Sequence, residues 1–152
     1  GDFLRLGEVG REQLLRLEAD VPLSCGVEQS EEVAAGARAE VAAAAAANER
    51  VVVLSHVPLF ALATLTCTVL WNAEDVMERL HRSGRVVAVF AGHDHKGGYA
   101  VDSAGVHHVT LPSPLNCGSD GAAHANVHVY ADRLHVEGCG LVPSREIGCQ
   151  RW

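Results

Sequence analysis

Two segments decide the fold of this chain: VVVLSHVP at residues 51–58 and VVAVFAGHDH at residues 86–95. Each begins with a continuous apolar, mostly β-branched run, which is typical of a strand buried on both faces. Histidine follows each run: His56 after the first, His93 and His95 after the second. In α/β proteins, ligands gather at the carboxyl ends of such strands. The sequence therefore predicts that three imidazoles meet at one edge of a sheet.

Helices are expected upstream of the first strand. Leucines lie among polar residues over 11–19, which predicts a short amphipathic helix. Residues 31–47 begin with glutamates, are rich in alanine and are followed by Asn48, so a longer helix is expected to end there.

Another helix is predicted between the two strands, over about 73–83. Asn72 is a suitable N-cap, and Gly84 is a suitable stop. Because helices bracket the two apolar strands, the fold class is expected to be α/β with the strands side by side.

The rest of the chain indicates antiparallel strands. Residues 99–102 and 106–111 predict one hairpin, and residues 126–130 and 134–137 predict another. A loop rich in Pro, Gly, Ser and Asn is expected over 112–123. Neither a repeat nor a second domain is indicated, so residues 1–152 are taken as part of one domain.

Composition narrows the function classes. The chain has 152 residues, of which 48% are hydrophobic, and a formal charge of -7, which argues against a general nucleic-acid backbone binder. The apolar runs are too short to cross a membrane. Five scattered cysteines without a Cys-x-x-Cys pair are typical of reduced thiols, so a soluble, cytoplasmic protein is expected.

The histidine spacing suits metal binding. In an extended Gly-His-Asp-His segment, His93 and His95 would point to the same side, while Gly92 and Gly97-Gly98 would let the backbone turn sharply. A neutral imidazole binds divalent metals through one nitrogen. Asp94 could orient a ring, cap the loop or face solvent, and the sequence leaves these roles open.

These residues resemble a known family. Ser55-His56-Val57-Pro58 and Gly92-His93-Asp94-His95 are similar to the last two motifs of the calcineurin-like metallophosphoesterases, which have an αββα sandwich fold. The extended string GHDHxGG, the continuation DSxGVHHVTL at residues 102–111 and Trp71-Asn72 resemble the manganese-dependent ADP-ribose/CDP-alcohol diphosphatases more narrowly.

The resemblance implies a two-metal hydrolase acting on a pyrophosphate bond in a nucleotide-diphosphate small molecule such as ADP-ribose or a CDP-alcohol. It implies that His56 and His93 bind one ion and His95 the other. Manganese is the metal of the family; iron and zinc also suit mixed nitrogen and oxygen ligation. No catalytic side chain is assigned, and the substrate-binding residues stay unassigned.

Departures from the family limit what this chain is expected to do. The earlier motifs Asp-x-His, Gly-Asp-x-x-Asp and Gly-Asn-His-Asp/Glu are missing, and residues 112–116 stand where Glu-Gly is expected. The chain is therefore expected to be the carboxyl-terminal part of the domain, inactive without the amino-terminal half. A non-catalytic scaffold or interaction module and a mononuclear metal-binding protein are the alternatives.

The other histidines are expected to have structural or surface roles. His107 and His108 alternate on a strand, so one of them at most could face the site. His81 is expected to face solvent. His128 and His135 are expected on a polar sheet face, and His124 in a loop.

Overall fold

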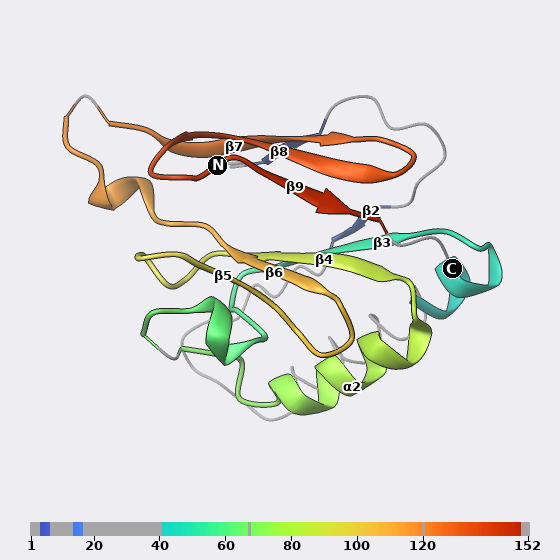
Figure 1. The fold of residues 1–152 in the computed structure, drawn as a ribbon. Coiled ribbons are helices and arrows are strands. Elements are labelled where there is room, and N and C mark those ends of the chain that lie inside the picture. Colours follow the sequence, from blue (N-terminus) through green and yellow to red (C-terminus); the bar gives the residue numbers. More distant parts are fainter. Residues whose placement is uncertain (1–3, 7–13, 17–40, 67, 120, 150–152) are drawn as a thin grey trace.

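Two β-sheets lie face to face in the computed structural model, and helix α2 (Ala73–Ser83) lies on the outer side of one of them (Figure 1). The structure describes residues 4–6, 14–16, 41–66, 68–119 and 121–149. The expected fold class, α/β with two sheets packed together, is confirmed.

The first sheet has five strands in the order β2-β3-β4-β6-β5. The pairs β2–β3, β3–β4 and β4–β6 are parallel, and β5 is an antiparallel edge strand. The parallel core brings the carboxyl ends of β3 and β4 to one edge. The strands are β2 (Leu14–Arg16), β3 (Val51–Ser55), β4 (Val86–Ala91), β5 (Gly98–Val101) and β6 (His107–Thr110).

The second sheet has four strands in the order β1-β7-β8-β9. Strand β1 runs parallel to β7, and the other two pairs are antiparallel. Both expected hairpins are confirmed, and β7 begins within the segment that was expected to be a loop. The strands are β1 (Leu4–Leu6), β7 (Ala123–Val129), β8 (Arg133–Gly140) and β9 (Arg145–Gly148).

Strand β4 lies at the centre of the core, because all six of its residues are buried. Val86 and Val89 belong to a cluster shared with α2, whereas Val87 and Phe90 belong to the cluster between the two sheets. Strand β3 divides its side chains between the same clusters. The expectation that both strands use both faces is confirmed.

The helices end where the sequence indicates. Helix α2 spans Ala73–Ser83 and ends at Gly84, whose φ is 62°. Residues 41–46 are helical, and Asn48 follows with a φ of 58°. Asn72 holds the N-cap position of α2, but its side chain makes no capping hydrogen bond. Two short 3-10 helices complete the elements: η1 (Ala61–Ala63) and η2 (Pro114–Asn116).

The helix expected over 11–19 is wrong where the structure describes it, since residues 14–16 form β2. Leu14 pairs with Val52 and Arg16 with Leu54 of β3. Hydrogen bonds to a neighbouring strand override the weak local preference of a short leucine pattern. The remainder of 11–19, and residues 31–40 of the longer expected helix, lie outside the described residues. In the part of the chain that is described, no helix is long and apolar enough to cross a membrane.

Candidate metal centre

His56 and His93 meet at the carboxyl edge of the first sheet. Ser55 of β3 lies in register with Ala91 of β4, and the Gly92 amide donates to the His56 carbonyl at 3.1 Å. This pairing brings Nδ1 of His93 to 3.2 Å from Nε2 of His56. The ring centroids are 5.2 Å apart and the ring planes are 75° apart. Two of the three predicted ligands are therefore brought together.

The loop that carries His93 is a tight turn, not the extended segment expected from the sequence. His93 has a φ of 63°, in the left-handed region that L residues rarely adopt. The Asp94 amide donates to the Gly92 carbonyl at 2.7 Å, and the Gly97 amide to the Asp94 carbonyl at 3.0 Å. The turn at Gly97 is confirmed by its φ of 70°. The expected extended backbone is wrong at His93, so the two-residue spacing does not by itself place the His93 and His95 side chains on the same side.

His95 stays a predicted ligand. Its side chain is exposed, and its carbonyl accepts from the Ser113 amide at 3.1 Å and from Asn116 Nδ2 at 2.7 Å. Among the residues that the structure describes, no group of three or more His, Cys, Asp or Glu side chains is arranged to hold a metal ion. The loop after β6, which departs from the family pattern, is thus tied to the histidine turn.

The His56–His93 pair fits a shared metal ion. Two nitrogens bound to one tetrahedral ion at about 2.0–2.1 Å would lie roughly 3.3–3.4 Å apart, close to the 3.2 Å found here. Both side chains are exposed, which leaves room for further ligands. The geometry suits imidazole-preferring divalent ions.

Asp94 has the capping role that the sequence left open. Its side chain is buried, and its two oxygens accept from the backbone amides of Leu65, Thr66 and Lys96 at 2.8, 2.9 and 3.0 Å. Burial opposes its ionisation, but these hydrogen bonds outweigh burial, so the pKa of Asp94 lies below its ordinary value. The carboxylate therefore stays charged at neutral pH.

A buried carboxylate, Asp102, holds two other histidines. Its Oδ2 lies 2.8 Å from Nε2 of His81 and 2.9 Å from Nε2 of His108. Sequence reasoning placed His81 toward solvent, which is wrong, because this contact draws the ring inward from α2. Burial lowers the pKa of His108 despite the nearby Asp102, so its ring is neutral at pH 7. Asp-Ser-x-Gly is a common turn pattern and could have identified Asp102 as a turn residue.

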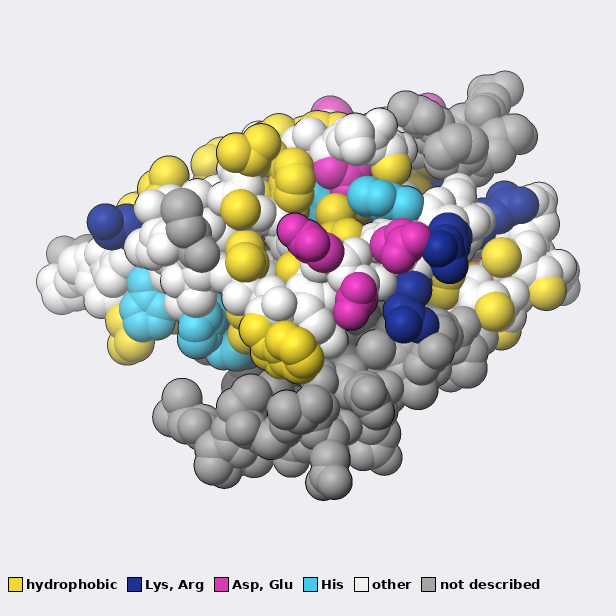
Figure 2. All heavy atoms as spheres, turned by 90° about the horizontal axis from the view of Figure 1, so that it is seen from below, with side chains coloured by type: hydrophobic (Ala, Val, Ile, Leu, Met, Phe, Trp, Pro, Cys, Tyr) yellow, Lys and Arg dark blue, Asp and Glu magenta, His cyan; other side chains and the backbone are white. Residues whose placement is uncertain are grey.

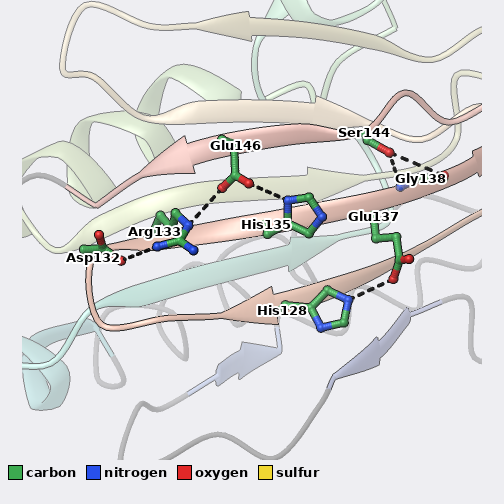
Figure 3. Close-up of polar contacts among 8 residues, drawn as sticks. All are labelled: His128, Asp132, Arg133, His135, Glu137, Gly138, Ser144 and Glu146. Carbon is green, nitrogen blue, oxygen red and sulfur yellow. Dashed lines mark hydrogen bonds and ion pairs between the residues drawn. The ribbon is translucent and has the colours of Figure 1, made fainter.

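The outer face of the second sheet has its own histidine pairs (Figure 3). His128 Nε2 lies 2.9 Å from Glu137 Oε2, and His135 Nδ1 lies 2.6 Å from Glu146 Oε1. The expected polar face is confirmed.

His107, in β6 of the first sheet, lies half-buried beside Tyr99 of β5. The Tyr99 hydroxyl is 2.8 Å from Nδ1 of His107.

On the α2 side of the molecule, charged side chains of both signs gather in the centre of the face (Figure 2). Histidines lie both beside these charged side chains and at one edge, next to hydrophobic side chains. Three large exposed hydrophobic residues come from the segment between β3 and α2: Leu62, Leu65 and Trp71. The segment that Asp94 holds is thus apolar on its outer side.

Comparison with known proteins supports the resemblance. No family model matches the chain. The manganese-dependent ADP-ribose/CDP-alcohol diphosphatase of Bos taurus is 40% identical over 98 residues, which cover 64% of this chain and 29% of that protein. Its Homo sapiens counterpart is 39% identical over the same length and coverage. The chain spans less than a third of the length of these curated relatives.

Two solved structures share the fold. A dimetal phosphatase from Danio rerio superposes with a TM-score of 0.74 at 32% identity, covering 84% of this chain and 43% of that one. GAP50 of Plasmodium superposes with a TM-score of 0.59 at 9% identity, covering 91% of this chain and 49% of that one. The second likeness concerns the fold alone. Together with the sequence relatives, the first confirms the resemblance to metallophosphoesterases.

Proposed function

We propose that this chain, a relative of the manganese-dependent ADP-ribose/CDP-alcohol diphosphatases, supplies part of a two-metal hydrolase centre. The substrate is a nucleoside diphosphate linked to a small molecule, and the bond cleaved is the pyrophosphate bond. Residues 1–152 would form the carboxyl-terminal part of a single domain. Five scattered cysteines without a Cys-x-x-Cys pair favour the cytoplasm.

His56 and His93 are the proposed ligands of one ion, and His95 that of the other. When bound, such ions polarise a phosphoryl oxygen and lower the pKa of a bound water. The chain contributes two rings held at the right separation, on the rigid ends of β3 and β4, with their outer side open. Manganese follows the relatives' names, and iron or zinc would also suit imidazole.

The observation that carries this proposal is the 3.2 Å approach of the two ring nitrogens. They come from residues 37 apart in sequence, and no carboxylate hydrogen bond to either ring is found within the described residues. An exposed pair of this kind gains more from a shared cation than from one neutral hydrogen bond. Mononuclear metal binding is the second candidate, because the described residues place only two of the three histidines together.

A chimera tests the hydrolase. Residues 51–111 of this chain replace the matching segment of the Danio rerio dimetal phosphatase, and ADP-ribose hydrolysis is measured with and without Mn²⁺. The proposal expects Mn²⁺-dependent turnover that His93→Ala abolishes. His107→Ala is the matched control, because His107 begins β6 at the opposite edge of the sheet and should leave turnover intact.

The chain by itself is expected to be inactive and to bind Zn²⁺ or Mn²⁺ weakly. Turnover of ADP-ribose by the isolated chain, lost in His93→Ala, would show that the two-histidine pair suffices and would contradict the part-centre proposal. An inactive chimera whose structure is intact would favour mononuclear metal binding if the chain binds an ion, and a scaffold if it does not.

A further inference from the structure

His93 is held in a conformation that its own residue type disfavours. Its φ of 63° crowds the Cβ of an L residue, and Asn48 is the one other non-glycine residue of the described chain with a positive φ. Strained backbone of this kind persists only where the surrounding structure over-determines it. Something next to His93 must therefore hold the turn.

Asp94 is the residue that holds it. Its Oδ1 accepts from the Lys96 amide at 3.0 Å, inside the turn, while Oδ2 accepts from the Leu65 and Thr66 amides at 2.8 and 2.9 Å. Asp94 is about 2% exposed, so water competes little for these hydrogen bonds. One carboxylate thus joins the histidine turn to a segment about 28 residues away in sequence.

That segment is itself firmly seated. It includes η1, which packs on the start of β5: a Cβ added to Gly98 would lie 2.3 Å from the Ala63 carbonyl oxygen. Ala63 and Thr64 are buried. Asp94 is therefore hydrogen-bonded to a segment that packs against the sheet, and not to a free loop. Gly98, the last glycine of the Gly-His-Asp-His-x-Gly-Gly string, allows this close approach because it has no Cβ.

We propose that Asp94 is a positioning residue of the metal site: by anchoring the turn to residues 65 and 66, it keeps His93 in the left-handed conformation that points its ring at His56. It binds no metal itself. The inference rests on the proposed function in that His93 is taken as a ligand. The short Asp side chain suits this role because its oxygens reach amides on both sides of the turn.

The test compares two Asp94 variants with the unmodified chain by NMR. Asp94→Asn keeps the shape but loses one acceptor, and Asp94→Ala loses both. Asp94→Ala is expected to weaken Zn²⁺ binding about tenfold or more, as for other residues that orient metal ligands. The Zn²⁺ affinity of Asp94→Asn should lie between that of the unmodified chain and that of Asp94→Ala. A second readout needs no metal: the strong intraresidue NOE between the amide and Hα protons of His93, the signature of positive φ, should fade in both variants.

Asp102→Asn is the matched control, because Asp102 is also buried and accepts the amides of Ala104 and Val106 in its own turn. It should lower the melting temperature yet leave the Zn²⁺ affinity and the His93 NOE unchanged. Unchanged affinity and NOE in Asp94→Ala would overturn the proposal, as would equal weakening by Asp102→Asn. If the unmodified chain binds no Zn²⁺ but the NOE still fades, the positioning role stands and the proposed function fails.

Discussion

Histidines at the two ends of the first sheet lie in opposite environments. At the edge that carries His56 and His93, two exposed rings face each other, and one sits on strained backbone. Behind α2, His81 and His108 share the carboxylate of Asp102, and the His108 side chain is about 3% exposed. The first arrangement leaves imidazole nitrogens accessible, and the second pairs Nε2 of each ring with a buried carboxylate.

The two arrangements give the histidines of this chain different roles. A ring beside a carboxylate already has a partner, and its contribution is to stability. Strain and exposure together cost stability and are retained where a site needs them. The His56–His93 pair has the second character, whereas His81, His108, His128 and His135 have the first.

The largest expected effect is on the buried side of this comparison. Asp102→Ala leaves two histidines and two backbone amides without their acceptor, and should lower the free energy of unfolding by about 3 kcal/mol. Urea unfolding followed by circular dichroism measures it. Asp132→Ala, an exposed carboxylate beside Arg133, is the control and should change stability little. A loss from Asp102→Ala no larger than that of the control would mean that the buried cluster is unimportant.

Acid should weaken the fold through the same cluster. The pKa of His108 is lowered by burial, and that of His107 by burial and the charges of His108 and Arg145, so both lie below the ordinary 6.5. As pH falls below about 6.5, these two histidines become protonated in the unfolded chain but stay neutral in the folded chain. The free energy of unfolding therefore falls. Melting temperatures from pH 7.5 to 5.5 check this, and His107→Gln with His108→Gln should flatten the slope. If the double variant leaves the slope of melting temperature against pH unchanged, the pH dependence comes from other groups.

At the exposed pair, a substitution can raise stability while it removes function. His93→Gly relieves the positive φ and should stabilise the chain by up to about 1 kcal/mol, the strain relief exceeding the flexibility that glycine adds. Zn²⁺ binding should disappear. His93→Ala removes the ring but keeps the strain, so it should bind no ion and be less stable than His93→Gly. Equal stability of the two variants would show that the turn is unstrained.

The smallest effect is expected on the outer face of the second sheet. The pair His135–Glu146 is largely solvent-exposed, so its coupling in a double-mutant cycle should be less than about 1 kcal/mol and should shrink in high salt. Zn²⁺ affinity should be unaffected. A coupling as large as that of the Asp102 cluster would show that burial does not decide how much a histidine–carboxylate pair contributes to stability.

The sequence was a good guide to β3, β4, α2 and both hairpins, because continuous apolar runs and terminal glycines are local signals. It failed at residues 14–16, where pairing with Val52–Leu54 decides the structure. It also missed β9, whose REIG sequence has no pattern long enough to identify a strand. Both errors come from partners that are distant in the chain.

The site was predicted in part for the same reason. Parallel neighbours bring His56 and His93 to one edge, and this follows from their positions after two buried strands. The turn that carries His93 and His95 is hydrogen-bonded by Asp94 to a segment about 28 residues away, a contact that no local spacing reveals. The shared carboxylate of Asp102 links α2 to β6 and was equally hidden.

The most direct test is a Zn²⁺ titration of the chain observed through the imidazole nitrogens of all nine histidines by NMR. The account predicts that the signals of His56 and His93 shift together and saturate, while those of His81, His108, His128 and His135 stay in place. Unmoved His56 and His93 signals, or larger shifts at the carboxylate-paired rings, would contradict it.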